Sequence, residues 1–357
     1  PYDAGARDAA QINDIHWDHA FYNGRYYVYF GIVPCLLFQL PFEALTGIQN
    51  LAYAPCMVVL GLLLLAACFG VVGQAVRRWF PQTSAAAYLL AVAAVVLGSQ
   101  LYYLLVRPYI YEYAILCGAA LLMLGLWLWL SAASTPVEKR GAILAKLAFG
   151  SLFVALVAGC RPQMELFAFL AVPIFWQRYI GQKRLCSRAG AGEAAAFILP
   201  VVVVAAGLMW YNAARFGSPL DFGANYNLTG NDMTQRGFNA VRIGPAVFTS
   251  LFELPSWQGV FPFLRETDVQ TNAVIRTISE KFTGGMLAAT PYLWVLALPL
   301  LPAFRRCLHR RRAVAGIVYG GIAAMVVMTV VDCEMAGVLY RYLMDLSLIH
   351  ISEPTRR

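Results

Sequence analysis

Eight long apolar runs recur along the chain, and their length constrains the fold more than any other feature. Each run has about 20 residues, and a helix of that length rises about 30 Å, the thickness of the hydrocarbon core of a membrane. Because 60% of the 357 residues are hydrophobic and only 13% are charged, a water-soluble globule is excluded. We therefore predict an all-α fold, a polytopic transmembrane helical bundle with about eight spanning helices. The runs are Ala54–Val76, Ser84–Leu105, Tyr109–Leu130, Ala142–Gly159, Gln163–Ile180, Ala194–Tyr211, Gly285–Ala303 and Ala313–Val331.

Basic residues gather in every second connection between these runs, and this pattern predicts the orientation. Connections rich in Lys and Arg stay in the cytoplasm. The alternate connections then lie outside, and the net charge of +8 reports topology and not a nucleic-acid partner. We predict an integral protein of a bacterial cytoplasmic membrane with its active face outward. The clusters are Arg77-Arg78, Lys139-Arg140, Arg178 with Lys183, Arg184 and Arg188, and Arg305-Arg306 with Arg310-Arg311-Arg312.

The stretch Tyr26–Thr46 is a further apolar segment, but its composition favours the outer surface of the membrane. It contains Gln39, Glu43, two prolines and a band of Tyr and Phe, which suit an interfacial helix better than a span. We expect a first outer loop with this helix over 1–53, a transmembrane bundle over 54–214, a long outer loop over 215–284 and a second part of the bundle over 285–346.

The two ends of the chain carry their own expectations. The sequence starts at Pro1 within a polar segment, so we interpret it as a fragment. Residues 347–357, "SLIHISEPTRR", resemble translated adapter sequence, and we treat them as an artefact tail; a short natural polar tail is the alternative.

Two Arg-Pro pairs lie at outer turns, each just before a run that returns to the cytoplasm. Proline favours the first helical position, so we expect Arg107 and Arg161 at the positive ends of helix dipoles, where anions bind. The two guanidinium groups are candidates to hold a phosphate in a two-pronged contact. The alternative is that each arginine only reaches toward lipid phosphates, as interfacial arginines often do.

Five segments in order, "PYDAGARDAA", "WDHAFYNGRYYVYFGIVP", "RPYIYEYAI", "GCRPQMELF" and "YNAARFGSPLDFGANYNLTG", resemble uncharacterised bacterial members of the GT-C superfamily of membrane glycosyltransferases. This superfamily includes protein O-mannosyltransferases and aminoarabinose transferases. The resemblance implies a polyprenyl-phosphate sugar as donor and an active site on the outer face. It also implies an acidic catalytic residue in the first outer loop, which in this chain lies either among the residues present or upstream of Pro1.

Transfer of a sugar to an acceptor hydroxyl requires a carboxylate that takes the proton of the hydroxyl. The candidates are Asp18, Asp3 and Glu112. Each has a structural alternative: Asp18 as a helix cap, Asp3 in a surface pair with Arg7, and Glu112 as a favourable charge in a first helical turn. We assign substrate binding to Arg107 and Arg161 and, among the outer polar residues, to His19, Asn225, Tyr226 and Arg341.

Other classes of function stay open at this point. No metal site is assigned among the candidate residues, and participation of a divalent metal is left open. No cofactor is assigned beyond the polyprenyl-phosphate sugar, which is the donor substrate. The acceptor is a hydroxyl of a glycan, a lipid or a protein. A flippase or transporter of a polar lipid is the first alternative, although charged residues at the centres of helices, typical of transporters, are missing from the apolar runs. A non-catalytic membrane protein of envelope assembly is the second.

Overall fold

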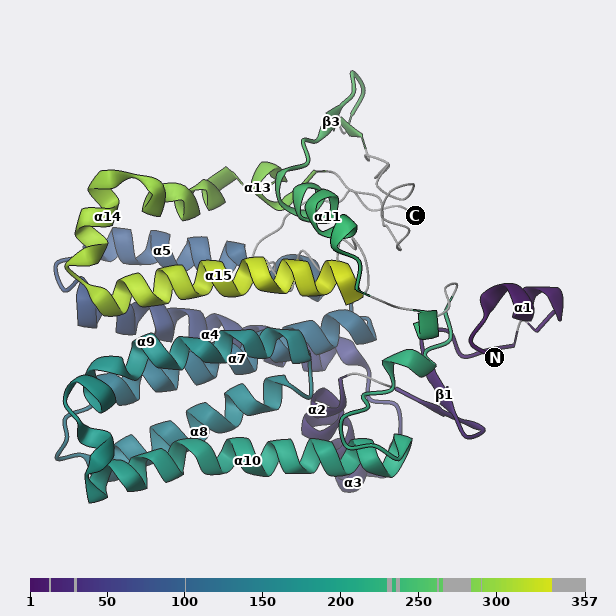
Figure 1. The fold of residues 1–357 in the computed structure, drawn as a ribbon, viewed down its shortest axis with the longest axis horizontal. Coiled ribbons are helices and arrows are strands. Elements are labelled where there is room, and N and C mark those ends of the chain that lie inside the picture. Colours follow the sequence, from purple (N-terminus) through teal and green to yellow (C-terminus); the bar gives the residue numbers. More distant parts are fainter. Residues whose placement is uncertain are drawn as a thin grey trace.

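The computed structural model describes residues 1–12, 14–28, 31–99, 101–229, 233–235, 238–261, 263–265, 284–289 and 291–335. Over these residues the protein is mostly helical, which confirms the predicted class. Five helices are long and apolar enough to cross a membrane, and they run side by side (Figure 1). They are α4 (Tyr53–Trp79), α7 (Ile110–Ser134), α8 (Arg140–Val157), α10 (Arg188–Phe216) and α15 (Arg312–Met335).

The other three apolar runs are interrupted, so eight continuous spanning helices are not shown. Each run consists of shorter helical pieces that run alongside the long helices (Figure 1). Prolines explain two of the interruptions, because proline lacks the amide that an α-helix needs. The pieces are α5 (Ala85–Gly98) and α6 (Leu101–Val106); the 3-10 helix η2 (Pro162–Leu170), α9 (Ala171–Phe175) and the π-helix η3 (Trp176–Gly181); and α13 (Met286–Ala289), the 3-10 helix η7 (Pro291–Leu300) and α14 (Pro302–His309).

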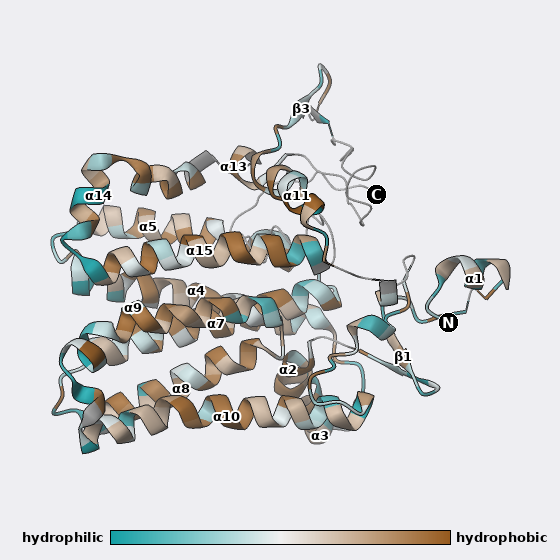
Figure 2. Ribbon diagram, in the orientation of Figure 1, coloured by the Kyte–Doolittle hydropathy of each residue, from teal (hydrophilic) through white to brown (hydrophobic). Residues whose placement is uncertain are grey.

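Helix α7 is the most enclosed of the long helices. It packs against α4 on one side and α8 on the other, and α10 covers α8. Trp129, Tyr113 and Leu116 on α7 are almost completely buried in the core. Helix α10, in contrast, leaves its apolar middle exposed. Hydrophobic residues occupy the middle of the long helices (Figure 2). These exposed flanks are the surface that a bilayer would cover.

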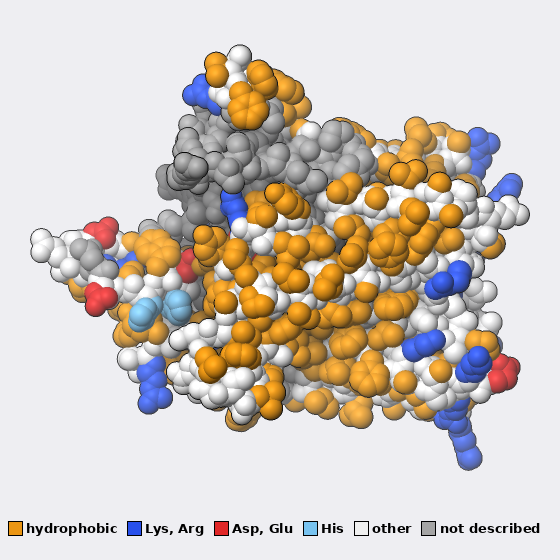
Figure 3. All heavy atoms as spheres, turned by 180° about the vertical axis from the view of Figure 1, so that it is seen from behind, with side chains coloured by type: hydrophobic (Ala, Val, Ile, Leu, Met, Phe, Trp, Pro, Cys, Tyr) orange, Lys and Arg blue, Asp and Glu red, His pale blue; other side chains and the backbone are white. Residues whose placement is uncertain are grey.

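The basic clusters all gather at one end of the bundle, where the turns α4–α5, α7–α8 and α14–α15 and the 3-10 helix η4 (Arg184–Cys186) lie (Figures 1 and 3). Two polar contacts stabilise this end. Arg178 donates to the carbonyls of Ala132 and Thr135 at 3.0 and 2.9 Å, and so caps the C-terminus of α7. Glu193, which has no exposed surface, pairs with Arg184 at 2.5 Å.

The opposite end carries the irregular segments. It begins with α1 (Ala4–Ala9) and an antiparallel hairpin of β1 (Ala20–Tyr22) and β2 (Arg25–Tyr27), in which Phe21 pairs with Tyr26. The predicted interfacial segment contains α2 (Ile32–Pro34), a π-helical turn η1 (Cys35–Gln39) and α3 (Leu40–Thr46). This helical stretch rises about 22 Å, which is less than the hydrocarbon core requires.

The loop after α10 completes this end. It contains the short 3-10 helices η5 (Ala224–Tyr226) and η6 (Met233–Gln235), the helix α11 (Ala240–Phe252) and a second hairpin of β3 (Ser256–Trp257) and β4 (Leu264–Arg265). Arg341 and the tail 347–357 lie outside the described residues, so the expectations for them stay predictions.

Small residues set the separation between α7 and α8, and this generates a test of the fold. A Cβ added at Gly125 would lie 2.5 Å from Val154 Cγ2 and 2.9 Å from the carbonyl oxygen of Gly150. We expect Gly125→Ala to destabilise the protein by about 1–3 kcal/mol, because over-packing forces the two backbones apart. The measurement is the thermal unfolding midpoint in detergent.

The matched control is Gly207→Ala on α10, where an added Cβ would meet nothing within 4 Å. There the higher helix propensity of alanine should leave stability unchanged or raise it by up to about 1 kcal/mol. Equal effects of the two substitutions would contradict the close α7–α8 contact.

Candidate functional site

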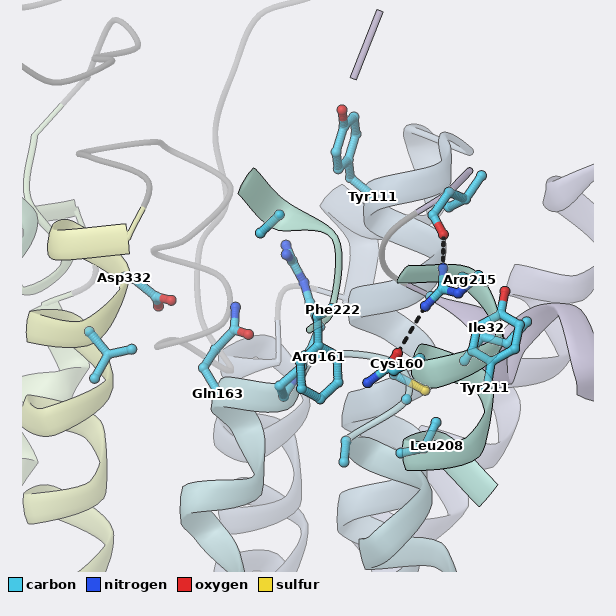
Figure 4. A pocket seen from close by; sticks show the side chains of 18 of the residues that line it. Ile32, Tyr111, Cys160, Arg161, Gln163, Leu208, Tyr211, Arg215, Phe222 and Asp332 are labelled. Atoms are coloured by element: carbon cyan, nitrogen blue, oxygen red, sulfur yellow. Dashed lines mark hydrogen bonds between the residues drawn. The ribbon is translucent and has the colours of Figure 1, made fainter. Parts of the chain in front are cut away.

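A cavity of about 480 Å³ opens among the ends of the helices on the side opposite the basic clusters (Figure 4). Its walls come from the segment before α2, from the α8–η2 turn, from α10 and the loop after it, and from the last turns of α15. Aliphatic and aromatic side chains, among them Ile32, Leu166 and Leu208, line its inner part. The charged and hydrogen-bonding side chains in the lining are Tyr111, Arg161, Gln163, Tyr211, Asn212, Arg215 and Asp332.

Among the predicted site residues that the structure describes, Arg161 is the one that lines the cavity. The turn after α8 places it at the N-cap of η2, and Pro162 occupies the first helical position, which confirms the predicted position of this proline. The following helix is of the 3-10 type and not α. The side chain is only 7% exposed and lies beside Gln163 in the cavity (Figure 4). A cation held in this way favours an anionic ligand.

The second Arg-Pro pair is arranged differently. Helix α7 begins at Ile110 with Tyr109 as its N-cap, so the prediction that Pro108 takes the first helical position is wrong. Residues 107–109 form a turn, closed by a hydrogen bond from the Tyr109 amide to the Arg107 carbonyl at 2.8 Å. The Arg107 guanidinium lies 4.5 Å from the ring centroid of Tyr103 and does not line the cavity.

Arg215 is a site residue that the sequence analysis missed. It lies in the last turn of α10 and donates to the Val28 carbonyl at 2.7 Å and to Asn212 Oδ1 at 3.0 Å. Its guanidinium also lies 3.8 Å from the ring centroid of Tyr211. Figure 4 shows the hydrogen bonds and the position of this side chain across the cavity from Asp332. The spacing Tyr-Asn-x-x-Arg, which puts three polar side chains on one face at the end of a helix, was the available signal.

Asp18 is connected to the cavity through Tyr111. The Tyr111 hydroxyl, from the first turn of α7, donates to Asp18 Oδ2, and Tyr111 itself lines the cavity. Asn227 Nδ2 lies 3.5 Å from Asp18 Oδ1. Asp18 is followed by strand β1, whereas a residue that caps a helix must be followed by a helix. The backbone of Asp18 is left-handed, with a φ of 57°. The alternative reading of Asp18 as a helix cap is therefore wrong.

The loop after α10 holds Asn227 in place by pairing with the first hairpin. The amide of Asp18 donates to the Leu228 carbonyl, and the amide of Leu228 donates to the His19 carbonyl, both at 3.0 Å. Asn227 is 1% exposed. Three segments that are distant in sequence thus meet at the Asp18 carboxylate: the first loop, the start of α7 and the loop after α10.

The other predicted acidic residues lie elsewhere at this end. Asp3 is exposed and caps α1, accepting from the Ala6 amide at 3.2 Å. Arg7, the expected partner of Asp3, donates instead to the carbonyls of Pro1 and Thr229. Glu112 is buried in the first turn of α7, next to Tyr111, but does not line the cavity.

The predicted substrate-binding residues outside the cavity are in the surrounding loops. His19 Nδ1 is 2.9 Å from the Trp17 carbonyl oxygen. Tyr226 donates to Asp221 Oδ2 at 2.8 Å, and this bond raises the pKa of the Tyr226 hydroxyl to about 12, so the phenol stays protonated at neutral pH. Its ring is 4.6 Å from that of Tyr22. Asn225 is exposed at the surface of the same loop.

Comparison with known proteins adds no further constraint on the site. No family model, no curated protein and no solved structure matches the chain. Within the described residues no group of three or more His, Cys, Asp or Glu side chains is placed to hold a metal ion.

The position of Arg215 generates a test of the site geometry. We expect Arg215→Lys to weaken the connection between α10 and the segment at Val28, because lysine keeps the charge but loses the forked donors. Hydrogen exchange of the peptide 20–28 and of the loop 217–229 should become faster by roughly five- to tenfold, about 1 kcal/mol of local stability.

The control is Arg25→Lys at the exposed start of β2, which should leave exchange in both segments unchanged. Unaltered exchange in the Arg215→Lys protein would mean that the two hydrogen bonds do not hold this end together.

Proposed function

We propose that the protein is a membrane glycosyltransferase that moves a sugar from a polyprenyl-phosphate donor to an acceptor hydroxyl on the outer face of a bacterial cytoplasmic membrane. In this proposal all eight apolar runs cross the membrane, three of them as broken helices. Broken helices are tolerated at membrane depth where the protein itself satisfies the freed backbone groups. The end with the basic clusters faces the cytoplasm, and the cavity opens outward.

One observation carries the proposal. Two arginines line a cavity with apolar walls, and a hydrogen-bonded carboxylate lies next to that cavity. Arg161 and Arg215 both line the cavity, and the Asp18 carboxylate is one hydrogen bond away through Tyr111. A lipid-linked sugar phosphate has matching parts, because it joins an apolar chain, an anionic phosphate and a polar sugar. The resemblance of the sequence to membrane glycosyltransferases points to the same ligand class.

The cavity suggests how the donor would be held. Arginine binds phosphate through two parallel hydrogen bonds, and these bonds are strong where water is scarce. We assign the phosphate to Arg161 and Arg215, and the first part of the lipid chain to the wall formed by Ile32, Leu166 and Leu208. Gln163 and Asp332 are then the groups available to the hydroxyls of the sugar.

The chemistry follows from the position of Asp18. Its carboxylate takes the proton of the acceptor hydroxyl while the acceptor oxygen forms a bond to the anomeric carbon. The bond between that carbon and the phosphate oxygen breaks, and polyprenyl phosphate leaves with the electron pair. Tyr111 orients the carboxylate, and Arg161 and Arg215 stabilise the charge that grows on the phosphate.

Substitution of Asp18 tests the assignment of the base. We expect Asp18→Asn to lower the rate of sugar transfer by about 10²- to 10⁴-fold, the usual contribution of a general base, while the affinity for the donor changes by less than about twofold. The measurement is transfer from a panel of radiolabelled polyprenyl-phosphate hexoses and pentoses in reconstituted membranes.

The control is Asp14→Asn, an exposed carboxylate on the same loop, which should keep the full rate. Full activity of the Asp18→Asn protein would move the base to another residue. Failure of the unchanged protein to transfer or bind any donor in the panel would favour the transporter or scaffold alternatives.

Substitution of Arg161 tests the phosphate site separately. We expect Arg161→Lys to weaken binding of the same donors by more than about fivefold, or about 1 kcal/mol, since the second prong of the contact is lost. Arg107→Lys is the matched comparison, because Arg107 also precedes a proline at this end but lies outside the cavity lining; its donor affinity should stay the same. If the Arg161→Lys and Arg107→Lys proteins have equal affinity for the donors, the phosphate does not bind at Arg161 in the cavity.

A further inference from the structure

Eight large apolar side chains are exposed away from the cavity at the end of the bundle opposite the basic clusters, which we name the outer end. They lie on α11, on the segment after it and on the β3–β4 hairpin, and we name them the interfacial patch. Phe261 and Trp257 are each 77% exposed, and Val260 and Leu254 are each 74% exposed. The members are Val241, Phe248, Phe252, Leu254, Trp257, Val260, Phe261 and Phe263.

Helix α11 is fixed at the outer end of α15. The Asn239 amide donates to Glu334 Oε2 at 3.0 Å, and Ser250 Oγ lies 3.7 Å from Cys333 Sγ. The buried side of α11, with Ala246 and Thr249, faces the protein. Because Phe248 and Phe252 lie one turn apart on the exposed side, α11 presents an aromatic face away from the bundle at the depth where α15 ends.

The hairpin extends this face. Its base is held where the Gly285 amide donates to the Glu253 carbonyl at 2.7 Å, and Trp257 pairs with Leu264 across the two strands. Figure 1 shows the hairpin projecting sideways, roughly perpendicular to the long helices, beside their outer ends. Figure 3 shows hydrophobic side chains on this projection and, apart from it, along the flank of the helices.

We propose that the interfacial patch inserts into the headgroup region of the outer leaflet, as a lateral anchor beside the bundle. Three observations support a lipid surface as the partner. The patch lies at the depth where α15 ends. It is also rich in Trp and Phe, and such aromatic residues are typical of amphipathic segments that lie at the membrane interface. The exposed Arg265 next to the patch suits lipid phosphates.

The anchor has a consequence for the cavity. Asp332 lines the cavity, while its neighbours Cys333 and Glu334 hold α11. An anchor attached through the same helical turn sets the depth at which the cavity opens relative to the lipid phosphates. This inference does not depend on glycosyl transfer, because any lipid-handling site at this end would be positioned in the same way.

A fluorescent depth measurement tests the anchor. An NBD label is placed at Phe261→Cys in a Cys307→Ser background, since Cys307 is an exposed cysteine at the opposite end, and labelling of the background protein is subtracted. The full chain is reconstituted in nanodiscs of phosphatidylethanolamine and phosphatidylglycerol. We expect a blue-shifted emission, at least threefold stronger quenching by headgroup-labelled nitroxide lipid than in the control, and at least threefold weaker quenching by aqueous iodide.

The control is Asn23→Cys at the turn of the first hairpin, which is exposed and polar and should report water. Two results would overturn the proposal. Iodide quenching at position 261 as strong as at position 23 would place the patch in water. Protection from both quenchers would place it in a protein contact, either with another part of the chain or with a second copy.

Discussion

The close contact between α7 and α8 is the constraint on which the site depends. Gly125 and Gly150 allow the two backbones to approach, and a Cβ at Gly150 would lie 2.7 Å from Trp129 Cδ1. Within a bilayer, helix association depends on such packing, because lipid chains are as apolar as the side chains they would replace. The separation of the two helices therefore determines where the turn after α8, and with it Arg161, can lie.

The same kind of close packing continues into the α8–η2 turn. A Cβ at Gly159 would lie 2.5 Å from Val33 Cγ2, and the Val33 amide donates to the Gly159 carbonyl at 3.1 Å. On the other side, Gly118 leaves room for Cys160 and Met164. The segment at α2 and the helix α7 thus hold the turn from two directions. These contacts hold the backbone of Arg161 in its buried position. An arginine that is already fixed would lose less conformational entropy on binding an anionic ligand.

The sequence was sufficient for the class of fold and for part of the site. Apolar length predicts the five continuous helices, because a helix that crosses a membrane must satisfy its own backbone groups. It does not distinguish them from the run 163–180, where Pro173 is compatible with hydropathy but not with a continuous α-helix. The Arg-Pro signal found Arg161 at the N-cap of η2 but failed for Arg107, because the turn at 107–109 delays the helix start.

The contacts of Asp18 were beyond local sequence patterns. Its partners Tyr111 and Asn227 are 93 and 209 residues away along the chain. Arg215 likewise takes its position from the Val28 carbonyl, 187 residues away. These positions depend on how distant segments of the chain pack together. Only a three-dimensional structure therefore shows that these polar side chains lie near one another.

The charge balance of the cavity bears on how the proposed reaction would be catalysed. Its described lining contains two arginines and one carboxylate, Asp332, and so carries one excess positive charge. A polyprenyl-phosphate sugar is a phosphodiester with a single negative charge, which this excess matches. After transfer the lipid retains a phosphate monoester with a charge of about −1.5 to −2 at neutral pH. Since the attraction to Arg161 and Arg215 would grow with that charge, the lining would stabilise the phosphate charge that develops in the transition state of the proposed transfer more than the charge of the bound donor, as catalysis requires.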